Sequence, residues 1–209
     1  MPCAEAVRRY EPEAEIIVVD DGIERGAKAA LQIQYCAVVV QGDKPFIFSR
    51  NVNIGIAAAR ANDVVILNDD AILKTPGGFS ILQSEAEEHP EIGIIAATTN
   101  NVGNKNQLNY GIGLRIDPRM VCFVAVLVPR RTIEKVGFLD EDFTGYGYDD
   151  DSYCLRVRRA GLKIGISDSC FVDHSSLKST FRGDGYPSEA FEHNRRIFEK
   201  KYGASNDAL

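Results

Sequence analysis

The stretch Val64-Val65-Ile66-Leu67-Asn68-Asp69-Asp70 joins an apolar run to a polar triplet that ends in two carboxylates. Glu15 to Asp20 and Ile92 to Ala97 are two more short apolar runs. Such runs are typical of strands that are buried on both faces of a sheet. We therefore expect an α/β fold with a mixed, mainly parallel central sheet.

Helix-like segments lie between and after these runs. The segment Asp149 to Ala160 has acidic residues in its first turn and basic residues in its last turn, which suits the helix dipole, and Gly161 is placed to end it. Other segments of helical composition are Ile54 to Ala61, Phe79 to Glu88 and Arg131 to Val136, whereas Met120 to Val128 has strand character. The alternation predicts helices that flank the sheet.

The composition limits the class of protein. A chain of 209 residues with 44% hydrophobic residues is long enough for one domain with a full core. The net charge of −6 and the absence of a basic stripe predict no binding to duplex nucleic acid. No apolar run approaches the roughly 18 residues that a membrane-spanning helix needs, and the start has no signal-peptide pattern. The five scattered cysteines predict reduced thiols in the cytoplasm of a cell or infected host, with the protein free or peripheral to a membrane.

Carboxylates follow two of the predicted strands. In open parallel sheets, ligands bind outside the carboxyl ends of the strands, which is where Asp20, Asp21, Asp69 and Asp70 fall. The segment Thr98 to Asn109 is rich in Asn, Gly and Thr, and we expect it to be a mobile loop.

A second acidic cluster, Asp149-Asp150-Asp151, and His174 after another apolar run complete the candidate functional residues. Each has a structural interpretation when taken alone. An Asp pair after a strand is often a turn or a cap, an acidic first turn suits a helix dipole, and a single histidine at a strand end is more often structural than a ligand. Their combination and order favour a functional interpretation.

These segments also carry a resemblance to a known family. They are Glu-Ile-Ile-Val-Val-Asp-Asp-Gly (15 to 22), Pro-Phe-Ile-Phe-Ser-Arg-Asn-Val-Asn-Ile-Gly-Ile-Ala-Ala-Ala-Arg (45 to 60), Val-Ile-Leu-Asn-Asp-Asp (65 to 70), Val-Gly-Phe-Leu-Asp-Glu-Asp-Phe (136 to 143), the run from Gly147 to Gly161, Val-Asp-His (172 to 174), Asn194, and Lys-Lys-Tyr-Gly (200 to 203). Together they resemble the inverting glycosyltransferases of family 2, which have the Rossmann-like GT-A fold. The resemblance implies one GT-A domain over residues 1–209, with a nucleotide-sugar-binding half (1–110) and an acceptor-side, catalytic half (111–209).

The resemblance implies a divalent metal that neutralises the departing diphosphate. It makes Asp70 a metal ligand, places Asp69 near the ribose or a metal-bound water, and makes His174 a nitrogen ligand. A mixed oxygen and nitrogen set suits Mn²⁺, with Mg²⁺ as the second choice.

The resemblance also assigns the second cluster. Asp150 is the expected general base, which takes the proton of an acceptor hydroxyl, and Asp149 precedes it in place of the more usual Glu. Three adjacent carboxylates should repel one another and raise at least one pKa. Asp151, Tyr146 and Tyr148 are candidates for acceptor binding, although core packing is an equal alternative for the two tyrosines.

Donor recognition follows the same resemblance. Asp20 and Asp21 are expected at the edge of the nucleobase, uracil by default, with Asn53, Gly55 and Arg60 on the nucleotide side. The family normally begins with an apolar strand, where this chain has the helix-like segment Ala4 to Tyr10. We therefore expect an unpaired sheet edge.

The predicted function is transfer of a sugar, with inversion, from a UDP-sugar to an acceptor hydroxyl on a glycan, a lipid-linked sugar, a protein or a small molecule. One alternative is a catalytically inactive module of the same fold that binds nucleotide sugars. A sugar-phosphate nucleotidyltransferase is a weaker alternative, because the chain shows no Gly-rich basic loop near its first strand.

Overall fold

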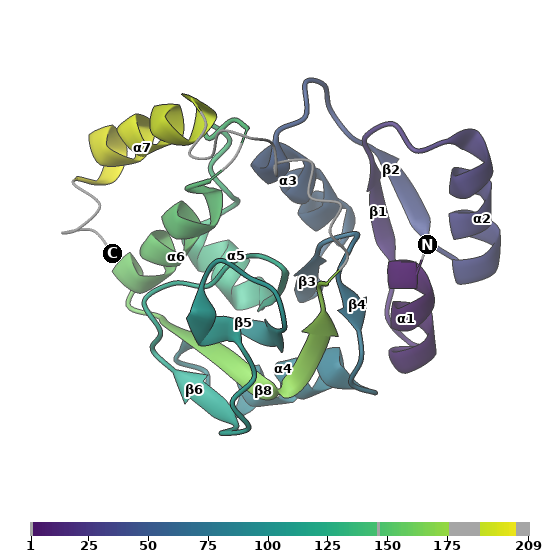
Figure 1. Cartoon of the computed structure of the whole chain (residues 1–209), viewed down its shortest axis with the longest axis horizontal. Helices are drawn as coiled ribbons and strands as arrows, with labels where there is room; N and C mark the ends of the chain where they lie inside the picture. The colour runs from purple at the N-terminus through teal and green to yellow at the C-terminus, as the bar shows by residue number, and fades with distance from the viewer. Residues whose placement is uncertain (1, 146, 176–188, 204–209) are drawn as a thin grey trace.

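The computed structural model describes residues 2–145, 147–175 and 189–203 (Figure 1). The helices are α1 (Pro2–Tyr10), α2 (Arg25–Tyr35), α3 (Phe48–Ala58), α4 (Gly78–Glu88), α5 (Arg130–Val136), α6 (Asp149–Arg159) and α7 (Glu189–Tyr202), with one 3₁₀ turn, η1 (Lys105–Gln107). The strands are β1 (Ile17–Asp20), β2 (Val38–Gln41), β3 (Val64–Leu67), β4 (Ile72–Leu73), β5 (Ile92–Thr99), β6 (Leu114–Ile116), β7 (Ala125–Val128) and β8 (Lys163–Asp173).

The central sheet is mixed and has six strands. Five follow the order β3-β7-β5-β8-β4, and β6 pairs with β8. β5 and β8 are parallel, whereas β7 lies antiparallel between β3 and β5. Consequently β3, β5 and β8 run in one direction. The parallel pair β1 and β2 forms a separate sheet. The predicted α/β class with a mixed sheet and flanking helices is confirmed.

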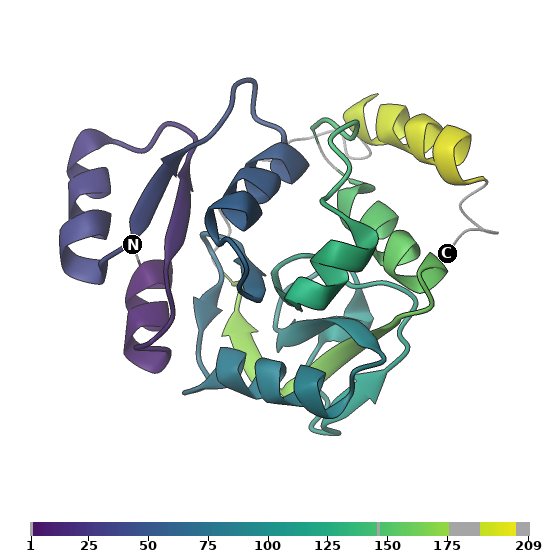
Figure 2. The same cartoon turned by 180° about the vertical axis from the view of Figure 1, so that it is seen from behind.

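Strand β5 is buried along its whole length and separates two hydrophobic layers. Ile95 belongs to the same cluster as Leu82 of α4. Ile94 belongs to the cluster that contains Val157 of α6. Because neighbouring residues of a strand point to opposite faces, α4 covers one face of the sheet and α6 the other, as the two views show (Figures 1 and 2).

The predicted elements are present, but α3 begins six residues before the predicted start at Ile54, and β7 begins five residues after the predicted start at Met120. Gly161 follows α6 with φ of 76°, the left-handed conformation that ends a helix. The segment before β1 is the helix α1, as expected. Within the described residues, β1 pairs only with β2 and β3 only with β7, so the predicted unpaired edges exist.

The prediction of a mobile segment from Thr98 to Asn109 is wrong in part. Thr98 and Thr99 are buried residues of β5, and Gln107 of η1 is fully buried. The Gln107 side chain bonds the backbone of Cys122, with the Nε2 donor 2.9 Å from the carbonyl oxygen. Composition alone did not predict these long-range bonds.

All five cysteines are free thiols, as predicted. In the described part of the chain, we find no helix whose length and apolar content would let it cross a membrane.

Candidate active site

Asp70 and His174 lie side by side. The chain turns after β3, with Asn68 N–H bonded to the Val124 carbonyl, and continues into β4. β4 pairs antiparallel with the end of β8, with Ile72 opposite Asp173. This pairing places Asp70 Oδ1 3.0 Å from His174 Nε2, although 104 residues separate them in the chain.

The contact has a definite chemical requirement. His174 Nδ1 lies 2.8 Å from the Asn101 carbonyl oxygen, which can only accept a hydrogen bond. Nδ1 therefore carries a proton, and Nε2 either donates a second proton to the Asp70 carboxylate or presents its lone pair to a ligand. Two acceptors 3.0 Å apart need a shared proton or cation between them.

The donor atoms fit a divalent ion. Two ligand atoms at a right angle, each about 2.1 Å from an octahedral ion, are about 3.0 Å apart. The side chains of His174 and Asp70 are 18% and 23% exposed, so solvent and ligands reach them. No third His, Cys, Asp or Glu completes a metal cluster among the described residues. Two protein ligands leave coordination positions for water or phosphate oxygens.

Asp69, next to Asp70 in the chain, is exposed. Cys3 at the start of α1 contacts the same turn. Cys3 Sγ is 3.6 Å from the Asn68 carbonyl oxygen. Burial and the Asp69 carboxylate raise the pKa of the Cys3 thiol to about 12. The thiol therefore stays protonated at neutral pH and is a poor metal ligand.

The acidic turn, Asp149-Asp150-Asp151, forms the first turn of α6. Burial and the charge of Asp151 raise the pKa of Asp149 to about 6. Burial, and then repulsion by Asp149 and Asp151, raise the pKa of Asp150 well above its usual range. The predicted repulsion is confirmed, but burial is the larger cause.

The raised pKa of Asp149 makes stability depend on pH. The folded protein keeps a proton that the unfolded chain releases, so this group lowers the free energy of unfolding as the pH rises from about 4 to about 6. We expect Asp149→Asn to raise the free energy of unfolding by about 2 kcal/mol at pH 8 and by little at pH 4. Urea unfolding at both pH values measures this. Asp117→Asn, at an exposed position, is the control, and an equal gain at both pH values for Asp149→Asn would contradict the expectation.

One short segment, Cys122 to Val124, contacts both the acidic turn and the turn that carries Asp70. The Asp150 carboxylate lies against the Cys122 thiol and, after burial, contributes to raising its pKa to about 12. Two residues further on, the Val124 carbonyl accepts the hydrogen bond of Asn68, at the start of the turn that carries Asp70. Val124 N–H donates to the Cys122 carbonyl oxygen at 2.9 Å, so this segment is a tight turn and its two ends lie close together. The two acidic clusters therefore flank the same segment.

The predicted donor residues Asp20 and Asp21 lie at the carboxyl end of β1. Asp20 Oδ1 accepts hydrogen bonds from Gly22 N and Ile23 N, and Oδ2 pairs with Lys28 Nζ at 2.8 Å. These bonds, led by that of Lys28, lower the pKa of Asp20 to about 2. Asp20 thus fixes the turn into α2, and Asp21, which pairs with Lys44 at 2.5 Å, is the more accessible carboxylate.

Of the three further donor candidates, two have structural roles and the third lies away from the site. The Asn53 amide bonds the Leu139 backbone twice. Asn53 Nδ2 donates to the Leu139 carbonyl oxygen at 3.0 Å, and the Leu139 N–H donates to Asn53 Oδ1 at 2.9 Å. A Cβ at Gly55 would lie 3.3 Å from Val19 Cγ2, so this glycine lets α3 approach β1. Arg60 follows α3 and precedes β3, at the opposite end of that strand from Asp70. The structure does not bring Arg60 to the predicted site, because α3 carries the chain across the sheet.

Tyr148 is a core residue and not an exposed acceptor platform. It is 9% exposed, and its ring packs 5.0 Å from Phe191 and 5.2 Å from Phe198, centroid to centroid. Helix α7 covers it. Tyr146 lies outside the described residues.

Two residues near the site did not stand out in the sequence. Asn100 and Asn101 follow β5 and both contact His174. The Asn100 side chain accepts from the His174 backbone N–H, and the Asn101 carbonyl contacts the ring at Nδ1. The only sequence signal was an Asn pair directly after a buried strand.

The fold is that of GT-A glycosyltransferases, to judge from two solved structures. GalNAc-T7 in complex with UDP, GalNAc and Mn²⁺ is 12% identical, with a TM-score of 0.73 over 96% of this chain and 46% of that chain. The mannosyltransferase PcManGT from Pyrobaculum calidifontis, in complex with GDP-Man and Mn²⁺, is 16% identical, with a TM-score of 0.63 over 85% of this chain and 55% of that chain. This chain therefore spans about half the length of each.

The sequence model described as Glycosyl transferase family 2 matches residues 2–145, and the chain belongs to this family. A search of curated protein sequences finds no match.

Proposed function

We propose that the protein transfers a sugar from a UDP-sugar to an acceptor hydroxyl, with inversion, and that a divalent metal, Mn²⁺ in preference to Mg²⁺, binds to Asp70 and His174. The observation that carries the proposal is the 3.0 Å contact between Asp70 Oδ1 and His174 Nε2. A divalent cation can replace the proton that Nε2 and the carboxylate otherwise share. The solved structures of similar fold were determined with Mn²⁺ and a nucleotide or nucleotide sugar, which supports this choice.

The residues divide the work. When bound, the metal neutralises charge that develops on the departing diphosphate. Asp70 and His174 hold it, and Asp69 lies beside them towards solvent. Asp150 takes the proton of the attacking hydroxyl, since its raised pKa makes it a stronger base than an ordinary carboxylate. Asp151 binds acceptor hydroxyls.

On the donor side, we propose that Asp21 contacts the base, because its carboxylate is more accessible than that of Asp20. The metal site joins the two proposed halves of the domain, since Asp70 lies in residues 1–110 and His174 in residues 111–209. The five free thiols are consistent with a reducing cytoplasm. The acceptor is a hydroxyl-bearing glycan, lipid-linked sugar, protein or small molecule.

Hydrolysis of the donor tests the function without knowledge of the acceptor, because water can replace the acceptor hydroxyl. The protein is incubated with UDP-hexoses, UDP-N-acetylhexosamines and GDP-mannose, and free nucleotide is measured. We expect slow release of UDP with Mn²⁺ and none after chelation. Donor binding without any release would identify a binding module instead. If the protein neither binds nor hydrolyses any of these donors, the proposal is contradicted.

A further inference from the structure

His174 is held from behind by the turn that follows β5. Its backbone N–H donates to Asn100 Oδ1 at 2.9 Å, and its carbonyl oxygen accepts from Asn101 Nδ2 at 3.1 Å. Asn100 Nδ2 also donates to Asp173 Oδ1 at 2.8 Å. With the ring contact of Nδ1 to the Asn101 carbonyl, four bonds join the two turns.

These bonds decide what the imidazole presents to a metal. The Asn101 carbonyl fixes the proton on Nδ1, which leaves the lone pair of Nε2 free for a ligand bond. The Asn100 amide holds the His174 backbone against the same turn. Since the amide bridges Asp173 and His174, it restrains the backbone that carries the ring, while the Asn101 carbonyl restrains the ring itself.

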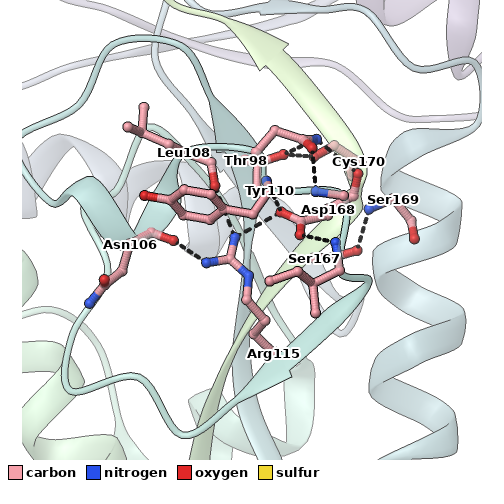
Figure 3. Close-up of polar contacts among 12 residues, drawn as sticks. Thr98, Asn106, Leu108, Tyr110, Arg115, Ser167, Asp168, Ser169 and Cys170 are labelled. Carbon is pink, nitrogen blue, oxygen red and sulfur yellow. Dashed lines mark hydrogen bonds and ion pairs between the residues drawn. The ribbon is translucent and has the colours of Figure 1, made fainter.

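The turn belongs to an Asn-rich loop, Asn100 to Gly113, that is anchored at its far end. Asp168 is 2% exposed and pairs with Arg115, Oδ1 to Nη2 at 2.8 Å (Figure 3). The Asp168 carboxylate also accepts from Ile112 N at 2.8 Å. The Arg115 guanidinium lies over the Tyr110 ring and donates to the Leu108 carbonyl at 3.0 Å.

Asp168 lies where β8 leaves its register with β5, between the pairs at Ser167 and Phe171. The irregular backbone turns this carboxylate towards the loop. The loop is therefore fixed to β8 at both ends, by Asp168 at one and by His174 at the other. A loop restrained in this way can hold a ligand in place.

We propose that Asn100 is a positioning residue for His174 that sets the orientation of its imidazole for metal binding, and that the Arg115 and Asp168 ion pair holds the loop that carries it. This inference rests on the metal site of the proposed function. It predicts that the Asn100 side chain, which is not a ligand, contributes to metal affinity.

Asn100→Ala removes the amide and leaves the Asn101 carbonyl in place. We expect the affinity for Mn²⁺, measured in the presence of saturating UDP by the EPR signal of free Mn²⁺, to fall about 10- to 100-fold. Asn106→Ala is the matched control. Asn106 is in the same loop, is exposed, and bonds Arg115 through its backbone carbonyl, so its replacement should leave the affinity within twofold of the wild type.

A second measurement needs no metal. Long-range ¹H–¹⁵N correlation spectra at pH 8 report which ring nitrogen carries the proton, and His174→Ala assigns the signal among the three histidines. The wild type and Asn106→Ala should show the Nδ1–H tautomer. In Asn100→Ala the His174 backbone is released from the turn, so the ring should leave the Asn101 carbonyl part of the time and show a mixture of the two tautomers. Thermal unfolding of the metal-free variants confirms that each is folded.

The outcomes separate the two proposals. If Asn100→Ala binds Mn²⁺ as the wild type does and keeps one tautomer, while His174→Ala has lost the metal, the positioning role is wrong and the metal site stands. If His174→Ala binds Mn²⁺ as the wild type does, the metal site is wrong. The tautomer of the Asn100→Ala protein then decides the positioning role alone.

Discussion

The Asp150→Asn protein is expected to release UDP from a UDP-sugar about 10²- to 10⁴-fold more slowly than the wild type, the usual range for loss of a general base. An amide has nearly the same shape as the carboxylate but cannot take a proton. Because the pKa of Asp150 is raised, the wild-type rate should rise with pH as the carboxyl ionises. This rise should be absent from the variant. A stopped or continuous assay of free UDP across pH 5 to 9 measures both effects.

Asp151→Asn is the matched control, since it changes a neighbouring carboxylate of the same helix turn. We expect it to lose much less activity. Both variants should bind UDP and Mn²⁺ as the wild type does, because neither residue is a proposed ligand. A full hydrolysis rate in Asp150→Asn would show that another group is the base.

Replacing Arg115 by methionine should lower the free energy of unfolding by about 3–5 kcal/mol. The substitution keeps much of the apolar volume but leaves the Asp168 carboxylate, 2% exposed, without its cation. Neutralising that carboxylate in the double variant Arg115→Met, Asp168→Asn should restore part of the loss. Urea unfolding of the two variants and the wild type provides the comparison.

Arg195→Met is the control for this prediction. Arg195 pairs with Glu192 and Glu199 on the surface of α7, where its side chain is 38% exposed. Surface pairs contribute little, so we expect a much smaller loss than for Arg115→Met. Equal losses for Arg115→Met and Arg195→Met would contradict the anchoring role of the buried pair.

The candidate metal site could be predicted because its residues follow strands. Asp70 comes after β3 and His174 after β8, and strand ends bring distant residues to a common edge. The acidic turn was likewise visible as the first turn of a helix. What the sequence did not show is the antiparallel pairing of β4 with the end of β8, which places Asp70 and His174 in contact.

Among the donor candidates that the resemblance implied, Arg60 lies apart from the others in the fold. Arg60 is seven residues from Asn53, but the length of α3 separates it from the carboxyl ends of the strands. Tyr148 was ambiguous because an aromatic side chain suits a sugar or a core equally. The Tyr148 ring packs against α7, more than forty residues later in the chain, and is therefore a core residue.

The prediction of a mobile segment from Thr98 to Asn109 did not foresee how this segment is anchored. Asn and Gly are common in mobile loops, and nothing local indicates that Asp168 would pair with Arg115 across 53 residues. Such bonds depend on the tertiary fold, which brings β6 beside β8.

The most direct test of the account is a crystal structure grown with UDP and Mn²⁺, with diffraction data collected at the manganese absorption edge. We expect an anomalous peak bonded to both Asp70 Oδ1 and His174 Nε2, next to the diphosphate. The proposed site is contradicted if the manganese ion is bound elsewhere while Asp70 and His174 contact each other and no metal.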